Sequence, residues 1–246
     1  MSIAPMDLRQ FKALTFDCYG TLIDWERGIL AELKPWVAAS GRALTDDQIL
    51  EGFGEAESAY EAATPSKLYP GILADTFRAL GKRWEVPASE AQAAAFGNSV
   101  PRWPAFPDSA GALQYLKRHY KLIILSNVDR ASFAESNKKL QVTFDKIVTA
   151  EDVGSYKPNP GNFRRLLAEV EKIGVRKEQV LHTAQSLFHD VAPAKAIGLK
   201  TCWINRRKGR PGGGATVLPE GDATPDIEFP SMAALVEEHH KQATAG

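Results

Sequence analysis

The chain has 246 residues, of which 44% are hydrophobic and 24% charged, proportions that are typical of a globular protein and exclude a disordered or fibrous one. Thirty basic residues balance thirty acidic ones, so the chain lacks the excess positive charge that favours binding to nucleic acid or anionic membranes. The sequence has no run of about 18 apolar residues and no signal-peptide pattern, so we expect a cytoplasmic protein that acts on a small molecule.

The first part of the chain predicts one strand followed by helices. An apolar run at residues 12–17 predicts the strand. From about residue 24 to residue 100 no strand-like run is found, and apolar residues recur at helical spacing at Ile49, Phe53, Ala56, Tyr60 and Ala63. Thr45 and Gln48 form the capping-box pattern that begins a helix. We therefore predict a helical insertion, and we interpret the proline-rich residues 101–107 as the hinge that leads the chain back to the sheet.

Strand-like and helix-like segments alternate in the rest of the chain. Strands are predicted at residues 121–126, 146–149, 179–183 and 200–204, with a weaker one at 226–229. This alternation predicts an α/β fold with a mostly parallel sheet. Two other features have simple interpretations. Cys18 and Cys202 are predicted to pack in the core, and the basic, then glycine-rich residues 206–219 to form a flexible surface loop with solvated arginines.

Polar residues lie at the ends of four predicted strands or in the loops that follow them, and these ends meet at one edge of a parallel sheet. Each signal alone also fits a structural role: an Asp at a strand end often forms a turn, and a Ser-Asn pair often caps a helix. Their joint occurrence, in order, predicts one site. The candidate residues are Asp17 with Thr21, Ser126 with Asn127, Lys157, and Ser186 with Asp190.

The same segments resemble the four motifs of the haloacid dehalogenase superfamily. The resemblance rests on Asp17-Cys-Tyr-Gly-Thr21, Ser126-Asn127, Tyr156-Lys157-Pro158 and the Asp190 segment. Among members of the superfamily, the L-2-haloacid dehalogenases are also similar at Thr-Cys-Trp-Ile-Asn-Arg, residues 201–206. The resemblance covers nearly the whole chain. It implies a Rossmann-like core of residues 1–24 and 101–246, a helical cap of residues 25–100, and a homodimer.

The resemblance also implies the chemistry of the site. Asp17 is the expected nucleophile, because a carboxylate that forms a covalent ester divides a difficult displacement into two easier steps. Lys157 is expected to lie between Asp17 and Asp190, where it keeps the nucleophile ionised and offsets the repulsion between the two carboxylates. Asp190, with Ser186 nearby, is the candidate for directing the water that hydrolyses the ester.

The remaining residues of the motifs are expected to support this reaction. Thr21 and Ser126 carry hydroxyl groups that orient the nucleophile, and Asn127 is expected to hold developing negative charge or to bind the substrate. For Ser126 and Asn127, helix capping remains an alternative role. Trp25 is the preferred aromatic contact for the substrate, and Trp36, Tyr60 and Tyr69 are further candidates for the pocket wall.

Tyr19 distinguishes two reaction types. Phosphatases of the superfamily have a second Asp at this position, which protonates the leaving group, whereas a departing halide needs no proton. The tyrosine therefore favours hydrolytic dehalogenation of a small 2-haloalkanoic acid without an obligatory cofactor. The alternative is a Mg²⁺-dependent phosphatase of a small phosphorylated metabolite, with Asp17 and Asp190 as metal ligands. A non-catalytic binding protein is the third hypothesis.

Three features depart from the dehalogenase pattern. Dehalogenases carry an arginine on the first long cap helix that binds the halide or the substrate carboxylate, but the predicted helix at residues 50–63 contains none. The candidate replacements are Arg27, Arg42, Arg78, Arg83 and Lys67. In the helix after the lysine motif, Phe163 stands where the dehalogenases have a tyrosine. Residues 185–190 read Gln-Ser-Leu-Phe-His-Asp, whereas the dehalogenases resemble Ser-Ser-Asn-x-x-Asp there. His189 is therefore a candidate for binding substrate or positioning water, and a plain hydrogen-bonding role is the alternative.

Overall fold

The protein is built around one parallel sheet in the computed structural model, which describes residues 6–210, 212–219 and 223–244. The strands follow the order β3-β2-β1-β4-β5-β6, and every neighbouring pair is parallel. Their bounds are β1 Ala13–Phe16, β2 Lys121–Ser126, β3 Lys146–Thr149, β4 Val180–Ala184, β5 Lys200–Ile204 and β6 Ile227–Phe229. The predicted α/β fold is confirmed, the weaker last strand included.

Helices cover both faces of the sheet because successive side chains of each buried strand point to opposite sides. Leu14 and Phe16 pack on one face with α5 (Ser109–Leu116), α6 (Arg130–Leu140) and α10 (Met232–Thr244). Ala13 packs on the other face with α8 (Pro160–Glu171) and α9 (Ala192–Ala196). The shorter elements are η1 Leu8–Gln10, η2 Val100–Arg102, α7 Ala150–Val153, η3 Lys177–Gln179 and the π-helical turn η4 Leu187–Val191.

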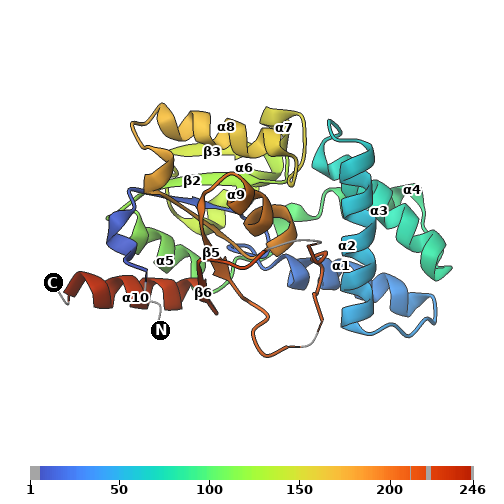
Figure 1. Ribbon diagram of the computed structural model, residues 1–246. Helices are drawn as coiled ribbons and strands as arrows, with labels where there is room; N and C mark the ends of the chain where they lie inside the picture. Colours follow the sequence, from blue (N-terminus) through green and yellow to red (C-terminus); the bar gives the residue numbers. More distant parts are fainter. Residues whose placement is uncertain (1–5, 211, 220–222, 245–246) are drawn as a thin grey trace.

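The chain between β1 and η2 forms four helices, which lie beside the sheet on the right of Figure 1. They are α1 Trp25–Ala39, α2 Asp46–Ala63, α3 Tyr69–Trp84 and α4 Glu90–Gly97. The predicted capping box begins α2: the Thr45 side chain accepts the Gln48 N–H, and the Gln48 side chain accepts the Thr45 N–H. Trp36 packs on Phe77, with ring centroids 4.2 Å apart, so it belongs to the interior of this helical group. The assignment of residues 25–100 to a separate cap domain stays a prediction.

The loop after β5 differs from the sequence prediction, because its first two arginines are not solvated. Arg206 donates to the Thr21 carbonyl and pairs with Asp108, at 2.8 and 2.9 Å. Arg207 pairs with Glu26 and Asp47, each at 2.9 Å. Carboxylates on both the sheet side and the helical side attract these guanidinium groups, so the described part of the loop links the two regions.

Two further observations concern the predicted core and membrane segments. Cys18 and Cys202 are both buried and unbonded to each other, as the packing interpretation predicted. No helix within the described ranges combines the length and the apolar character needed to cross a membrane.

Candidate active site

The candidate site lies at the carboxyl ends of β1, β2 and β4. The chain adds β2 and β3 on one side of β1 and then β4 to β6 on the other, so β1 and β4 flank the point at which the strand order reverses. Ligands of open α/β sheets bind at such a point. A small pocket lies there, with a cavity volume of about 30 Å³. It is lined by Asp17, Tyr19, Trp25, Glu57, Glu61, Tyr69, Asn127, Val128, Lys157, Gln185, Ser186, His189, Asp190 and Thr216.

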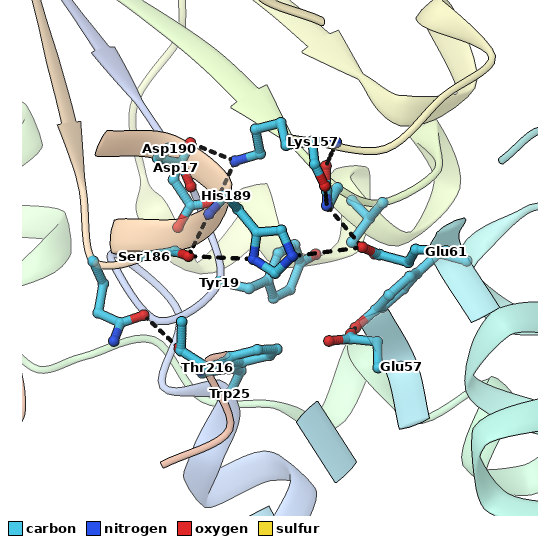
Figure 2. A pocket seen from close by; sticks show the side chains of 14 residues that line it. Asp17, Tyr19, Trp25, Glu57, Glu61, Lys157, Ser186, His189, Asp190 and Thr216 are labelled. Atoms are coloured by element: carbon cyan, nitrogen blue, oxygen red, sulfur yellow. Dashed lines mark hydrogen bonds and ion pairs between the residues drawn. The ribbon is translucent and has the colours of Figure 1, made fainter. Parts of the chain in front are cut away.

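The Lys157 ammonium group lies between the two predicted carboxylates (Figure 2). Its Nζ is 3.0 Å from Asp17 Oδ1 and 2.7 Å from Asp190 Oδ1, and the lysine side chain is 1% exposed. Burial alone would lower the pKa of Lys157, but the two carboxylates outweigh it and raise this pKa above its ordinary value. The site therefore holds a permanent cation next to Asp17, at the positions that the sequence predicted.

The two carboxylates have different environments. Burial raises the pKa of Asp17 above its ordinary value, although Lys157 acts in the opposite direction. For Asp190 burial also acts to raise the pKa, but Lys157 and His182 outweigh it and hold the pKa below its ordinary value. The Nε2 atom of His182 forms a hydrogen bond with Asp190 Oδ1 at 2.9 Å. The other ring nitrogen, Nδ1, forms a hydrogen bond with the Thr15 hydroxyl at 2.8 Å. His182 thus supports Asp190 from inside the sheet.

The turn after β1 holds the nucleophile candidate in place. Thr21 donates to Asp17 Oδ2 at 2.7 Å and accepts the Gln185 backbone N–H at 2.9 Å. Gly20 has φ of +89°, and a side chain there would come within 2.9 Å of the Gln185 amide oxygen. The backbone conformation therefore favours glycine at this position, whereas the Gln185 side chain could move away from a larger residue. The predicted orienting role of Thr21 agrees with this geometry.

The predicted hydrogen bond from Ser126 to the nucleophile is not formed. Lys157 and Thr21 already donate to the two oxygens of Asp17. The Ser126 Oγ is buried and has no partner among the residues that the structure describes. The expectation that Ser126 orients Asp17 is therefore wrong for this structure.

Asn127 binds the backbone of Lys157. Its side-chain oxygen accepts the Lys157 N–H at 2.7 Å, and its Nδ2 donates to the Lys157 carbonyl and to Glu61, each at 3.0 Å. Both amide hydrogens are thus in use. Asn127 lines the pocket, but its role in this geometry is to position the lysine rather than to receive negative charge, which corrects the sequence interpretation.

Three aromatic residues that the sequence suggested for the site line the pocket, namely Tyr19, Trp25 and Tyr69. The Tyr19 hydroxyl, however, contacts Ser136 Oγ at 2.8 Å, and burial raises the pKa of Tyr19 well above its ordinary value. It is therefore not available as a proton donor to a leaving group. Trp25 lies on the pocket wall and packs edge-on against Phe53, with ring centroids 5.9 Å apart.

Ser186 and His189 stand on the opposite wall, at the start of η4. Ser186 Oγ accepts the His189 backbone N–H at 2.9 Å and lies 3.2 Å from its Nδ1. Burial lowers the pKa of His189 to about 4, so its imidazole is neutral at pH 7. Its Nε2 faces Glu61 Oε2 at 3.9 Å. Ser186 therefore has the capping role, and His189 presents a neutral ring to the pocket.

The described candidates for the missing arginine lie elsewhere. Arg42 pairs with Glu85, Arg78 with Asp75 and Glu90, Arg83 with Glu55, and Lys67 with Asp75. Arg27 lines a separate surface depression beside α2. No arginine lines the pocket within residues 6–210, 212–219 and 223–244.

Sequence reasoning missed two glutamates in α2. Glu57 and Glu61 are 3% and 4% exposed and face the pocket, since residues four apart lie on one face of a helix. Tyr69 donates to Glu57 Oε1 at 2.5 Å. Burial raises the pKa of Glu57 to about 8, and burial together with Glu57 raises the pKa of Glu61 well above its ordinary value. Their spacing could have identified them, because Glu57 and Glu61 follow Phe53 at intervals of four residues and so lie on the same helix face as this buried residue.

The sequence analysis also missed two polar residues of the pocket wall and one buried histidine behind Asp190. Gln185 and Thr216 line the pocket, and the Thr216 hydroxyl donates to the Gln185 side chain at 3.1 Å. Thr216 comes from a distant loop, so no local pattern identifies it. His182 had a signal, because a histidine inside the apolar run at residues 179–183 needs buried partners.

The raised pKa of Glu57 predicts a pH-dependent stability. Because the folded pKa of about 8 exceeds the unfolded value of about 4.5, the neutral acid stabilises the fold at low pH. This contribution is lost as the pH rises between these values. We expect Glu57→Gln to raise the melting temperature relative to wild type more at pH 8.5 than at pH 5. Glu55→Gln, on the exposed side of the same helix, is the control, and equal shifts at both pH values would contradict the expectation.

Three comparisons with known proteins agree with this geometry. Residues 11–198 match the family model described as haloacid dehalogenase-like hydrolase. The haloacetate dehalogenase H-2 of Moraxella sp. strain B is 26% identical over 93% of this chain and 98% of the relative. The (S)-2-haloacid dehalogenase of Pseudomonas sp. strain YL is 29% identical, over 92% and 93%. An L-2-haloacid dehalogenase structure from Xanthobacter autotrophicus, with chloropropionic acid covalently bound, has a TM-score of 0.73 at 19% identity, covering 92% of this chain and 97% of that one.

Proposed function

Since the chain belongs to the haloacid dehalogenase-like hydrolase family, we propose that it hydrolyses the carbon–halogen bond of a small 2-haloalkanoic acid. The relatives named haloacetate dehalogenase and (S)-2-haloacid dehalogenase support this substrate class. The observation that carries the reaction type is the buried Asp17–Lys157–Asp190 cluster beside a tyrosine whose hydroxyl faces away. The overall reaction converts the 2-haloalkanoic acid and water into a 2-hydroxy acid, a halide ion and a proton.

In the first step a carboxylate oxygen of Asp17 attacks the carbon that carries the halogen. A carbon–oxygen bond forms, the carbon–halogen bond breaks, and its electron pair leaves with the halide. Lys157 and Thr21 hold the carboxylate so that no reorganisation is needed at the moment of attack. The ammonium of Lys157 also favours the ionised form of Asp17 and so opposes the effect of burial on its pKa.

In the second step water attacks the side-chain carbonyl carbon of the Asp17 ester. Asp190 Oδ1 is bound by Lys157 and His182, whereas Oδ2 is buried with no partner among the described residues. We assign Oδ2 as the acceptor of the water proton, because a buried acceptor without a donor is free to take one. The bond between the Asp17 carbonyl carbon and the ester oxygen then breaks, and the departing alkoxide takes up the proton held by Asp190. The hydroxy acid leaves, the Asp17 carboxyl group loses the second proton of the water to solvent, and its carboxylate is restored.

A phosphatase reaction fits this site less well. Transfer from a phosphate ester requires protonation of an alkoxide, and the Tyr19 hydroxyl is bound to Ser136. For Mg²⁺, the donor set is also a poor fit, since the ammonium of Lys157 already bridges the two carboxylates. Within the part of the chain that the structure describes, no group of three or more His, Cys, Asp or Glu side chains is gathered for a metal. We therefore route no step through a metal.

The direct test is product analysis with purified protein. Wild type is expected to release chloride from (S)-2-chloropropionate at the same rate before and after treatment with EDTA, because Lys157 supplies the positive charge. It is expected to release no phosphate from p-nitrophenyl phosphate, with or without Mg²⁺. Magnesium-dependent phosphate release without chloride release would replace this function by the phosphatase alternative.

We propose that residues 25–100 act as the cap, because α2 supplies one wall of the pocket and the core supplies the other. The homodimer and the cytoplasmic location stay predictions.

A further inference from the structure

The cap-side wall of the pocket is formed by two acids that have no Lys or Arg partner within the described residues. Figure 2 shows Glu57 and Glu61 facing the pocket opposite Ser186 and His189. The nearest basic group is the His189 ring, whose Nε2 lies 3.9 Å from Glu61 Oε2. Among the described residues, Glu57 forms no ion pair, and its side chain accepts a hydrogen bond from the Tyr69 hydroxyl. This wall is built around carboxyl groups rather than around a cation.

A carboxylate substrate needs hydrogen-bond donors at such a wall. Of the pocket residues in the described ranges, Lys157 is the one permanent cation, and its ammonium already serves Asp17, Asp190 and the Leu125 carbonyl. Asn127 has both amide hydrogens in use. The O–H groups of the two acids supply donors on this side of the pocket in addition to the N–H groups of Trp25, Gln185 and His189.

We propose that Glu57 and Glu61 bind the substrate carboxylate as neutral carboxylic acids, whose O–H groups act as the donors that an arginine supplies in other pockets. This inference rests on the proposed function, because it takes the 2-haloalkanoic acid as substrate. In each acid one oxygen accepts a hydrogen bond, from Tyr69 in Glu57 and from Asn127 in Glu61, which leaves the other oxygen to carry the proton. A carboxylic acid next to a carboxylate forms a strong, charge-assisted hydrogen bond.

The neutral state follows from the surroundings of the two acids. A buried carboxyl without a cation is more stable protonated, and two carboxyls four residues apart on one helix repel each other when ionised. An incoming substrate anion strengthens both effects. The titratable groups that face the two acids are Asp17, Tyr19, Tyr69, Tyr156, Lys157, His189 and Asp190. The pKa of about 8 for Glu57 agrees with a neutral acid at pH 7.

Binding of the acid substrate is thereby linked to protonation of the wall. Above the pKa of the wall, each substrate anion must bring one proton with it, so the apparent Kd and KM rise about tenfold per pH unit. An uncharged analogue of the same shape makes no such demand. A glutamine at either position offers an N–H donor at all pH values, so it keeps the binding and loses the pH dependence.

The first experiment compares (S)-2-chloropropionate with (S)-2-chloropropionamide between pH 6 and pH 9.5. We expect the wild-type KM for the acid to rise at least tenfold above pH 8 while the KM for the amide stays constant. The double variant Glu57→Gln/Glu61→Gln is expected to remove the rise, and each single variant to reduce it if the double variant does not fold. Glu55→Gln, outside the pocket on the same helix, is expected to behave as wild type. A constant KM for the acid, or a preference for the amide at pH 6, overturns the inference.

A second experiment separates this inference from the proposed reaction. The Asp17→Asn variant carries out no attack, so calorimetry in buffers of different ionisation enthalpy measures binding of (S)-2-chloropropionate and its proton uptake directly. We expect uptake of close to one proton above pH 8, and less in the same variant with Glu57→Gln/Glu61→Gln. Binding without proton uptake, or no binding at pH 6, overturns the inference. Absence of chloride release from the wild type, with proton-linked binding intact, defeats the proposed reaction alone.

Discussion

Replacing Asp17 by Asn is expected to abolish halide release, with a loss in kcat of at least about 10³-fold, because an amide oxygen is a poor nucleophile and forms no ester. The loss of stability is expected to stay within about 1 kcal/mol. Lys157 keeps Asp190 as its partner, and the asparagine oxygen can still accept the lysine donor. The asparagine NH₂ then faces the Thr21 hydroxyl, which can accept as well as donate. Chloride release by wild type and variant under single-turnover and steady-state conditions measures the loss of activity. Urea unfolding of both proteins measures the change in stability.

A control and a chemical readout make this prediction specific. Asp46→Asn changes an exposed carboxyl that pairs with Lys34 on the protein surface, and it is expected to leave turnover unchanged. In wild type quenched during turnover, the peptide that contains Asp17 is expected to gain the mass of the acid substrate less hydrogen halide. Turnover by the Asp17→Asn variant at the wild-type rate would remove Asp17 as nucleophile.

Replacing Lys157 by Met is expected to damage both activity and stability. The substitution leaves Asp17 and Asp190 buried and close together without the ammonium between them. Removing one partner of a buried ion pair costs about 3–5 kcal/mol, because the remaining charge is uncompensated. Halide release is expected to fall below detection, since Asp17 would then be held protonated by burial and by repulsion from Asp190.

The stability defect of Lys157→Met is expected to shrink at low pH. Without the lysine, burial raises the folded pKa of both carboxyls above the unfolded value, so the neutral acids stabilise the fold at low pH and this contribution is lost as the pH rises. Urea unfolding at pH 4.5 and pH 7.5 checks the difference. Lys138→Met, which removes an exposed lysine paired with Glu135, is the matched control. A defect of equal size at both pH values would contradict the role of Lys157 as a buried counter-ion.

Part of this protein was determined by local sequence. The strands, the capping box at Thr45 and the helical region were predicted because side-chain periodicity and cap chemistry act within a few residues. The positions of Asp17, Lys157 and Asp190 were predictable as well. Parallel strands place their carboxyl ends at one edge, so residues at four such ends meet whatever the details of packing.

Tertiary structure alone decided which hydrogen bonds these residues make. Ser126 and Asn127 differ from expectation because Thr21 and Lys157 already occupy the oxygens of Asp17, and because the amide of Asn127 reaches the backbone of Lys157. Competition among donors for a few acceptors depends on distances of a few ångströms between segments that are far apart in the chain. Sequence periodicity carries no information on such distances.

The pocket's charge was likewise decided by packing between the helical region and the core. Local sequence placed Glu57 and Glu61 on one face of a helix, but a helical face with glutamates is ordinarily exposed to water. The contact of α2 with the ends of β1, β2 and β4 buries that face, and burial without a cation is what holds the acids neutral. Local residue patterns therefore determined the fold and the reacting groups, whereas desolvation, which exists only after the segments meet, decided their protonation and the chemistry of the wall that faces the substrate.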